Sequence, residues 1–506
     1  MNTPIVDFVR SYMDSSPVRL HMPGHKGKPL LGPEALDITE IKGADALYEA
    51  SGIIRESERN ASALFGTEDT FYSTEGSSQV IRAMLYLAGL YARTKTGKTA
   101  GKMSGITSEI SAGETAGITS EETAEKTAGA DSRRMTGKTN PERRIRILAS
   151  RNVHKAFLYA CALLDYDIIW LPGDIRESYL SIRTSKAQLE EKLEELTEEE
   201  CLPDAVFVTS PDYLGNLADI RGFSGVLKTW DIPLLVDNAH GAYLHFLEEP
   251  AHPMDLGADL CCDSAHKTLT ALTGCAYLHI GRKPEGAGKS ERAAFFAANA
   301  KNALALFGST SPSYLLLESL DLTNKVLSER YRESLAAFVR KTERLKQTLT
   351  EKGFRLIGEE PLKIALDAGA YGYRGDELAD ILRTDHIECE HADRDVTVFM
   401  LTPGNTDEEL ERLEKVLMNI CRREEIRPEK ELFRLPPCRQ AISVRDAVMR
   451  PHRIVDAGFS EGLIAGAPLV SCPPAVPIVI SGERITKAHI AMFQYYGICR
   501  VEVIDE

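Results

Sequence analysis

Strand-like apolar runs alternate with helical patterns through roughly the first 300 residues, and this alternation limits the fold more than any other feature of the sequence. Several of the runs are continuously apolar, as expected for strands that are buried on both faces of a sheet. Strands separated by helices are typical of α/β domains with mostly parallel sheets. The expected strands are 144–149, 167–171, 204–209, 233–237, 259–263 and 275–280. The expected helices between them include 79–92, 186–196 and 223–230.

The length of 506 residues suggests more than one domain. Residues 94–140 are rich in Thr, Gly, Ser, Ala, Glu and Lys and repeat Gly-Ile-Thr-Ser-Glu, which indicates a flexible, low-complexity insertion. A helical stretch over 314–352 and an α+β segment over 354–421 follow, then a Pro- and charge-rich linker over 427–438 and a turn-rich end. The expected domains are an N-terminal segment at 1–60 that lines the active site, a large domain at 61–310 with the insertion at 93–142, a long helix with a small α+β domain at 311–425, and a C-terminal α+β domain at 426–506.

Composition excludes several classes of protein. The net charge of −15 argues against nucleic acid as a main partner, because phosphate backbones require basic patches. The first residues do not resemble a signal peptide, and no apolar run reaches the length that a membrane helix needs. The ten cysteines are scattered without a C-x-x-C pair. A reduced, cytoplasmic setting is therefore expected.

The turn Ser264-Ala-His266-Lys267 follows an apolar run and places a lysine, Lys267, just past the end of an expected strand. A half-buried lysine carries a desolvation cost unless it is neutral or bonded. Condensation with an aldehyde cofactor removes the charge, and it needs a lysine of lowered pKa. A surface lysine after a strand is the alternative interpretation of this turn.

Asp237 ends another apolar run and is followed by Asn-Ala-His240-Gly. In open α/β sheets, ligands bind outside the carboxyl ends of the strands. In enzymes that use pyridoxal 5'-phosphate (PLP), a carboxylate there keeps the pyridine nitrogen protonated, so that the ring accepts the electrons of a carbanion. A metal ligand and a helix N-cap are the alternatives for Asp237. The Lys267 motif about thirty residues later favours the PLP interpretation.

Two further motifs follow expected strands. Gly76-Ser77-Ser78 opens a helix, where free N–H groups and hydroxyls suit a phosphate, although serine-rich helix starts are also common as caps. His154 lies just past another strand end, where an imidazole could stack on a pyridine ring or serve only as a helix N-terminal residue. The order of phosphate loop, stacking histidine, pyridine acid and lysine resembles that of fold-type I PLP enzymes.

Longer motifs make the resemblance specific. The sequence resembles the short form of the bacterial ornithine/lysine/arginine decarboxylase family, nearly from end to end apart from the insertion. The matching stretches are His21-Met-Pro-Gly-His-Lys26, Asp37-Ile-Thr-Glu40, Thr74-Glu-Gly-Ser-Ser78, Arg151-Asn-Val-His-Lys155, Asp237-Asn-Ala-His-Gly241, Ser264-Ala-His-Lys267, Ser309-Thr-Ser-Pro-Ser-Tyr314, Leu401-Thr-Pro-Gly404 and Cys472-Pro-Pro-Ala-Val-Pro477.

The resemblance implies a fold-type I large domain and a role for each matching residue. Lys267 would form the Schiff base with PLP, Asp237 would pair with the pyridine nitrogen, and His154 would stack on the ring. His240 would lie beside the cofactor. The phosphate would be bound by Gly76, Ser77, Ser78, Ser264 and His266. Ser309 and Ser311 would reach the phosphate of the neighbouring subunit, which implies a homodimer with shared active sites.

The sequence also departs from the family pattern. Larger members begin with a response-regulator-like wing domain that builds decamers, and this sequence starts at the linker that follows it, so a decamer is not expected. The C-terminal motif has Ala475-Val476 where Gly-Ile or Gly-Val is more usual. The insertion has no recognised counterpart.

The implied reaction is α-decarboxylation of a basic amino acid, with Lys267 or His266 returning a proton to the α-carbon. Arginine is favoured by analogy with short-form relatives, lysine and ornithine are the alternatives, and the amine product would enter polyamine metabolism. Aminotransferase or β-eliminating chemistry is a rival that an arginine such as Arg374, clamping the α-carboxylate, would favour. A non-catalytic PLP-binding relative is a second rival.

Two questions concern the substrate and metals. The side chain that reads the distal cation should be acidic, with Glu461 or a residue of the partner subunit as candidates. A metal site at His21 and His25 is not expected, because Pro23-Gly24 prevents the regular helix that would bring the two imidazoles together.

Overall fold

The computed structural model describes residues 1–111, 143–175, 178–282, 290–426, 440–468 and 476–505, with the backbone alone over 96–111. Within these ranges, no helix combines the length and the apolar character that crossing a membrane would require.

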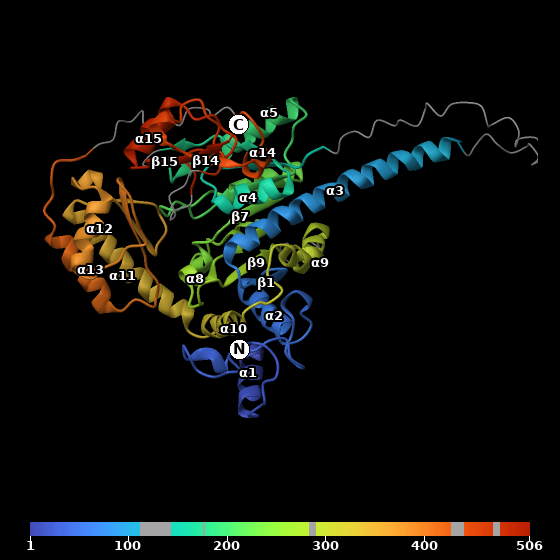
Figure 1. Cartoon of the computed structure of the whole chain (residues 1–506), viewed down its shortest axis with the longest axis horizontal. Helices are drawn as coiled ribbons and strands as arrows, with labels where there is room; N and C mark the ends of the chain where they lie inside the picture. Colours follow the sequence, from blue (N-terminus) through green and yellow to red (C-terminus); the bar gives the residue numbers. More distant parts are fainter. Residues whose placement is uncertain (112–142, 176–177, 283–289, 427–439, 469–475, 506) are drawn as a thin grey trace, which may run out of the picture.

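A seven-stranded sheet forms the centre of the fold (Figure 1). Its strand order is β1-β9-β8-β7-β6-β2-β3. The five strands from β8 to β3 pair in parallel, whereas β9 is antiparallel to both of its neighbours. The bounds are β1 Asp69–Ser73, β2 Arg146–Ala149, β3 Asp167–Trp170, β6 Ala205–Thr209, β7 Leu234–Asp237, β8 Leu260–Asp263 and β9 Ala276–Ile280. The expected α/β domain with a mostly parallel sheet is confirmed.

Helices cover both faces of this sheet, so its strands are buried on both sides. Apolar side chains of α3, α4 and α9 form one core with β2, β8 and β9. Side chains of α5 and α6 form a second core against β6 and β7. The bounds are α3 Gly76–Ser111, α4 Lys155–Leu164, α5 Lys186–Glu198, α6 Ile220–Trp230, α7 Pro253–Leu256, α8 Ala265–Thr268 and α9 Glu291–Leu306. The short elements beside them are β4 Asp174–Ile175, β5 Ile182–Arg183 and η3 Ala242–Phe246.

Helix α3 is longer than the sequence pattern indicates. It continues through residues 94–111, the first part of the segment expected to be a flexible insertion, and it projects away from the body of the molecule (Figure 1). Threonine and glycine lower helix propensity but do not forbid a helix, so composition alone does not locate its end. Residues 112–142 lie outside the described residues.

The helical stretch expected over 314–352 is two helices, α10 Tyr314–Ser328 and α11 Tyr331–Lys352. The backbone leaves the helical region at Glu329, where φ is −91° and ψ is −113°. The break lets Tyr331 pack edge-on against Phe246, with ring centroids 5.4 Å apart. A tertiary contact therefore interrupts a sequence whose local pattern is helical throughout.

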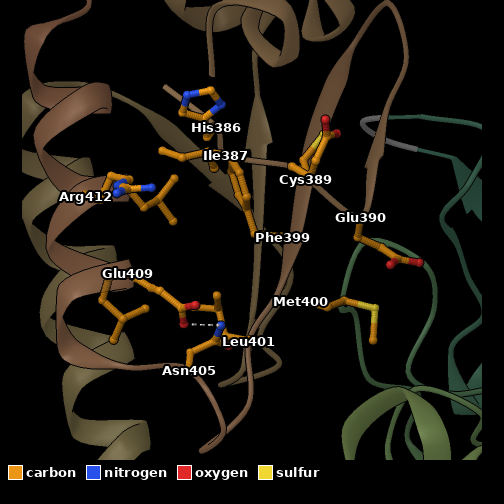
Figure 2. A pocket seen from close by; sticks show the side chains of 13 residues that line it. His386, Ile387, Cys389, Glu390, Phe399, Met400, Leu401, Asn405, Glu409 and Arg412 are labelled. Carbon is orange, nitrogen blue, oxygen red and sulfur yellow. Dashed lines mark hydrogen bonds between the residues drawn. The ribbon is translucent and has the colours of Figure 1, made fainter. Parts of the chain in front are cut away.

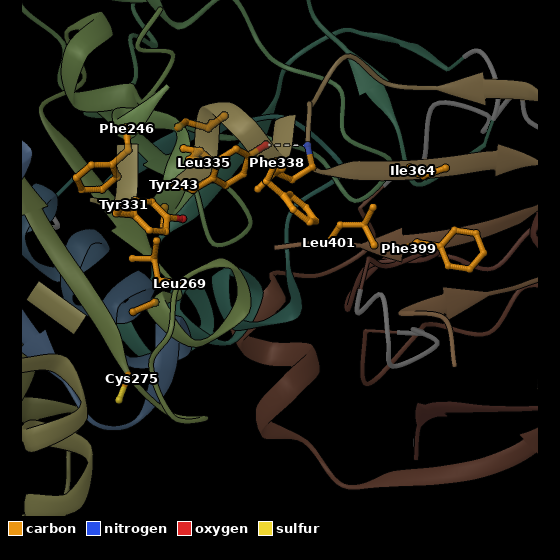
Figure 3. Packing of buried hydrophobic residues seen from close by; sticks show 14 of the residues in the cluster. Tyr243, Phe246, Leu269, Cys275, Tyr331, Leu335, Phe338, Ile364, Phe399 and Leu401 are labelled. Atoms are coloured by element: carbon orange, nitrogen blue, oxygen red, sulfur yellow. Dashed lines mark hydrogen bonds between the residues drawn. The ribbon is translucent and has the colours of Figure 1, made fainter. Parts of the chain in front are cut away.

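An antiparallel sheet in the order β10-β11-β13-β12 follows α11. Tyr243 and Phe338 of the preceding elements pack toward Leu401 beside this sheet (Figure 3). The Leu362 amide donates to the Tyr243 hydroxyl at 3.4 Å. The bounds are β10 Arg355–Ile357, β11 Lys363–Asp367, η4 Gly369–Tyr371, α12 Gly375–Thr384, β12 His391–Ala392, β13 Val396–Met400 and α13 Asp407–Asn419.

The two ends of the chain add smaller elements. At the C-terminal end, Glu483 receives both guanidinium nitrogens of Arg151 at 2.6 and 2.7 Å, which ties this region to the turn after β2. The bounds are α14 Val444–Met449, β14 His452–Asp456, η5 Ala457–Phe459, α15 Lys487–Tyr495 and β15 Arg500–Ile504. At the N-terminal end they are α1 Pro4–Asp14, η1 Pro33–Ala35, η2 Leu47–Glu49 and α2 Ile53–Phe65. The expected linker 427–438 and most of the 472–477 motif lie outside the described residues.

Candidate active site

The predicted site residues follow strands that end at one edge of the large sheet. In the register of the parallel strands, Asp237 pairs with Thr209 on one side and Cys262 on the other. The chain then turns at Ser264 into the short helix α8, which carries Lys267. Because parallel strands end at the same edge, residues 25–60 positions apart in the sequence come together there.

Lys267 is half-buried, and its Nζ atom lies 2.8 Å from Nε2 of His240. Burial lowers the pKa of its ammonium group, while the charges of Asp237 and Glu390 oppose that shift. A lysine with a lowered pKa is the form that condenses with an aldehyde. These surroundings differ from those of an ordinary surface lysine.

Asp237 is 3% exposed and accepts hydrogen bonds from the Ala239 amide at 3.2 Å and the Cys262 thiol at 3.3 Å. Burial raises the pKa of its carboxyl group, against the lowering effects of the Cys262 bond and the charge of Lys267. The bond to Ala239 is a local turn contact, and the next helical element, η3, starts only after Gly241. Asp237 is therefore not the N-cap of a following helix.

A buried network supports the strand ends from below. The side-chain amide of Asn238 donates to Oδ1 of Asp263 at 2.6 Å. Oδ2 of Asp263 lies 2.9 Å from Nε2 of His252 and 3.1 Å from Nε2 of His279. The two imidazoles hold the pKa of Asp263 well below its usual range. His252, Cys261 and Asp263 are also of metal-ligand type and lie close together. The hydrogen bonds that join Asp263 to Asn238, His252 and His279 explain why these residues lie together. They hold the loop after β7 in place.

His154 is the N-cap of α4, and its Nδ1 atom accepts the Ala156 amide at 3.1 Å. Burial, and then the charge of Lys267, lower its pKa to about 4. The imidazole is therefore neutral at pH 7 and lies within electrostatic range of the lysine. The capping interpretation is correct, and it leaves the stacking role as a separate proposal.

The expected phosphate residues lie at the start of α3 and at α8. Gly76 has a φ of +72°, and its amide donates to the Gly274 carbonyl at 2.8 Å. Ser77 and Ser78 are half-buried at the first turn of α3. Ser264 is fully buried and its hydroxyl has no hydrogen-bond partner among the described residues, while Nδ1 of His266 lies 2.9 Å from the Cys275 carbonyl.

Ser309 and Ser311 are exposed in the single chain. The Ser309 amide donates to the Glu75 carboxylate, so the Ser309 loop lies beside the Gly76 turn of the same chain. The Ser311 amide donates to the Ser309 hydroxyl at 3.1 Å. Neither hydroxyl is close enough to Lys267 for a hydrogen bond within the described contacts.

Sequence reasoning missed several residues that the fold adds to the site. Lys363, at the start of β11, places its Nζ atom 2.9 Å from Nδ1 of His240. Glu390 lies just before β12 and accepts the Tyr213 hydroxyl at 3.1 Å. A lysine inside the apolar run Leu362 to Leu366 was the one available signal, because such a buried charge needs partners.

Comparisons with known proteins agree with this geometry. A family model described as the major domain of Orn/Lys/Arg decarboxylase matches residues 127–364. The chain is 26% identical over 526 aligned positions to an arginine decarboxylase of Bacillus subtilis, covering 97% of this chain and 92% of the relative. It is 24% identical to an arginine decarboxylase of Bacillus anthracis, covering 96% and 92%. The chain is therefore similar to the Orn/Lys/Arg decarboxylase family.

Solved structures agree on the fold. The lysine decarboxylase of Francisella novicida superposes with a TM-score of 0.71 at 15% identity and covers 99% of this chain and 81% of its own. The constitutive lysine decarboxylase of E. coli gives 0.69 at 16% identity, with 100% and 82% covered. The expected fold-type I architecture is confirmed.

The residues of this site fit PLP. The unpartnered Ser264 hydroxyl and the first turn of α3 offer donors to a phosphate, which is the preferred ligand of a helix N-terminus. Lys267 offers an amine of lowered pKa, and Asp237 offers a buried carboxylate. These three features match, in this order, the phosphate, the aldehyde and the ring nitrogen of the cofactor.

Three other candidates have partners of their own: Arg374, Glu461 and the His21/His25 pair. Arg374, the residue that the aminotransferase rival would need, is half exposed and bonds Asp376 instead. Glu461 has a side chain that is 55% exposed, 4.0 Å from Lys487 in the C-terminal region. His21 contacts Tyr12, and His25 lies 3.1 Å from Asp37, so within one chain both imidazoles pack against the N-terminal segment itself.

Proposed function

We propose that this protein is a PLP-dependent decarboxylase that converts a basic amino acid, with arginine favoured, to the amine and carbon dioxide. The observation that carries the proposal is the position of Lys267, of lowered pKa, beside His240 at the sheet edge where Asp237 ends β7. The curated relatives that are named arginine decarboxylases favour arginine over lysine and ornithine.

PLP supplies the electron sink that makes loss of carbon dioxide from the α-carbon feasible. Lys267 would hold the cofactor, and its amine would be free while substrate is bound. Asp237 keeps a proton on the ring nitrogen, because its negative charge favours the protonated form. His154 remains neutral, so that it packs against the ring without adding a positive charge.

The proton that replaces carbon dioxide comes from a group beside the α-carbon. Lys267 and His266 were the expected donors, and His266 directs Nδ1 to the Cys275 carbonyl. The Nζ atom of Lys267 is within hydrogen-bond distance of Nε2 of His240. We assign the donor role to Lys267 and a phosphate-binding role to His266, with Gly76, Ser77, Ser78 and Ser264.

We propose Glu390 as the residue that binds the distal cation. Its charge acts on Lys267, and its side chain is exposed in the single chain. In Figure 2, Glu390 and Met400 point away from the pocket between the small sheet and α13, toward the elements of the large sheet. A carboxylate in that direction offers charge-assisted hydrogen bonds to a guanidinium or ammonium group.

The active unit is proposed to be a homodimer with shared sites. Ser309 and Ser311 are exposed, as they must be to reach the neighbouring subunit's phosphate. The N-terminal segment also exposes large apolar side chains, among them Leu20, Leu30 and Leu31, each 89% exposed. Isolated exposed leucines are ordinary, but a cluster favours a covered surface.

The remaining expectations belong to the same proposal. The enzyme would act in the cytoplasm, in polyamine metabolism. Its chain would divide into the N-terminal segment 1–60, the large domain 61–310, the small domain 311–425 and the C-terminal domain 426–506. The boundaries at 310/311 and 425/426 lie in loops, between α9 and α10 and after α13, whereas the boundary at 60/61 lies inside α2.

The test is an assay of the purified, PLP-loaded enzyme with arginine, lysine and ornithine. We expect carbon dioxide and the matching amine in equal amounts, with arginine the best substrate. Keto-acid without amine would overturn the decarboxylase proposal and establish the aminotransferase rival. A PLP-bound protein that turns over none of the three would establish the non-catalytic rival.

A further inference from the structure

Lys363 is a buried lysine that links the small sheet to the site. It is the first residue of β11, yet its side chain reaches the loops that follow β6 and β7. Only 2% of its surface is exposed. Burying an ammonium group is costly unless its hydrogens find acceptors, so the partners of Lys363 define its role.

Three acceptors surround Nζ of Lys363. They are Nδ1 of His240 at 2.9 Å, Oε2 of Glu360 at 3.1 Å and the backbone carbonyl of Asp212 at 3.3 Å. An ammonium group has three N–H donors and no acceptor. The contact with Glu360 is an ion pair, whereas the other two contacts are hydrogen bonds. Because an ammonium group has no lone pair, the Nδ1 atom of His240 must accept.

This bond decides which nitrogen of His240 carries the proton. A neutral imidazole has one N–H and one acceptor nitrogen, so Nε2 holds the hydrogen when Nδ1 accepts. Burial and the charge of Lys363 keep the pKa of His240 well below its ordinary value, so the ring is neutral. Its Nε2–H then faces the Nζ atom of Lys267, 2.8 Å away.

We propose that Lys363 is a positioning residue that fixes the tautomer of His240 and thereby holds the free amine of Lys267 neutral. A nitrogen that receives a hydrogen bond must offer a lone pair, and a protonated lysine has none. The neutral amine is the form that attacks and the form that can accept a proton. This inference rests on the proposed function, because it assigns the reacting amine to Lys267.

The surroundings hold Lys363 in place. The Gly215 carbonyl accepts the amides of Glu359 and Glu360, both at 2.9 Å, and the Tyr243 hydroxyl donates to Oε1 of Glu360 at 3.1 Å. Gly215 has a φ of +86°, and an added Cβ would lie 3.2 Å from the Cβ of Glu360. The turn before β11 is thus fitted closely against the loop after β6.

Other charged groups act on the same pair. Asp237 and Glu390 face Lys267 and favour its charged form, whereas Lys363 disfavours it. His154 and His266 face His240. Removing Lys363 should therefore raise the pKa of Lys267, because the two carboxylates that favour its charged form are then less opposed.

The first experiment is nitrogen NMR of the PLP-free protein labelled with 15N at histidine, with the His240 signals identified by their loss in His240→Gln. We expect a neutral ring at pH 7 with its hydrogen on Nε2. A wild-type ring with its hydrogen on Nδ1, or a charged ring, would overturn the proposal without any variant of Lys363. Because no cofactor or substrate is present, the result is independent of whether the decarboxylase proposal holds.

The second experiment compares Lys363→Met with Lys346→Met. Lys346 is a matched control, since its Nζ atom donates to the Glu360 carbonyl at 2.6 Å without touching His240. The rate of reductive methylation of Lys267 is measured against pH in each PLP-free protein by mass spectrometry. We expect Lys363→Met to raise the midpoint of the pH dependence of Lys267 methylation by about one pH unit, the lower end of the effect of one nearby charge. In the same variant, the hydrogen of His240 should no longer be fixed on Nε2.

The control should leave both readouts unchanged. An unaltered tautomer in folded Lys363→Met would overturn the positioning role. Equal shifts in both variants would also overturn it, because they would show a general loosening around Glu360. If Lys363→Met does not fold, the wild-type spectrum alone decides.

Discussion

The Cys262 thiol donates a hydrogen bond to Oδ1 of Asp237 at 3.3 Å, between residues that are paired in the β7-β8 ladder. Both side chains are buried. The Ala239 amide also donates to Oδ1, so both described bonds of this carboxylate end on the same oxygen. A thiol is a weak donor, which holds the carboxylate in position without neutralising its charge.

The Asp237→Asn variant removes that charge and keeps the shape. We expect its kcat to fall by about 10² to 10³-fold, the loss typical of removing one preorganised electrostatic partner. The measurement is steady-state amine production, with Asp255→Asn as control because Asp255 pairs with His245 away from Lys267. A variant with wild-type kcat would remove Asp237 from the proposed mechanism.

The Lys267→Ala variant should lose the covalent link to the cofactor. We expect the wild-type protein to turn yellow when PLP is supplied and to retain the label after borohydride reduction. The variant should do neither, because it lacks the amine that would condense with the aldehyde. Lys341→Ala, which removes an exposed lysine that pairs with Asp407, should behave as wild type. Reduction that labels a different lysine in the wild-type protein would contradict the assignment.

The Glu390→Gln variant tests recognition of the distal cation. We expect KM for arginine to rise by about 10 to 100-fold, since losing one charge-assisted bond costs about 1.5 to 3 kcal/mol. Because the α-carbon chemistry is unaltered, kcat should change much less. Glu461→Gln is the matched control and should leave KM unchanged, since Glu461 lies beside Lys487. A rise in KM for Glu461→Gln, with KM unchanged for Glu390→Gln, would assign binding of the distal cation to Glu461 instead.

His154 should make stability depend on pH. Its folded pKa of about 4 lies below the ordinary 6.5, so between these values the unfolded chain binds a proton that the folded chain does not. The free energy of unfolding should therefore fall as pH drops from 6.5 to 4, by about 3 kcal/mol at about 1.4 kcal/mol per pKa unit. Asn retains the cap, so urea unfolding of His154→Asn should show a shallower dependence. Parallel wild-type and variant curves would contradict the neutral, buried imidazole.

The ion pair between Glu58 of α2 and Lys301 of α9 should stabilise the folded protein. Glu58 is fully buried and bonds the Lys301 ammonium and, at 3.1 Å, the Tyr72 amide. Lys301→Met would leave this carboxylate without its main partner, and we expect a loss of about 3 to 5 kcal/mol in the free energy of unfolding. The double variant Glu58→Gln/Lys301→Met should recover part of that loss. Chemical denaturation measures both, and additive effects would refute the coupling.

The sequence was most informative where a local pattern has a local cause. The strands 233–237 and 259–263 were predicted to within a residue, because continuous apolar runs bounded by polar turns have few other interpretations. Asp237 and Lys267 were identified because each follows such a run. The helical stretch at 314–352 failed at Glu329, where contact between Tyr331 and Phe246 outweighs local propensity.

What the sequence by itself determined is the sheet, the motif order and the identity of the residues at the strand ends, since these follow from short-range periodicity and residue type. Only the tertiary structure decided that Lys363 and Glu390, about 100 or more residues after Lys267, complete the surroundings of its amine. The physical reason is that the small sheet packs against the large one through contacts such as Leu362 with Tyr243. Nothing in the spacing of two distant charges records which of them such packing brings within hydrogen-bond distance of His240.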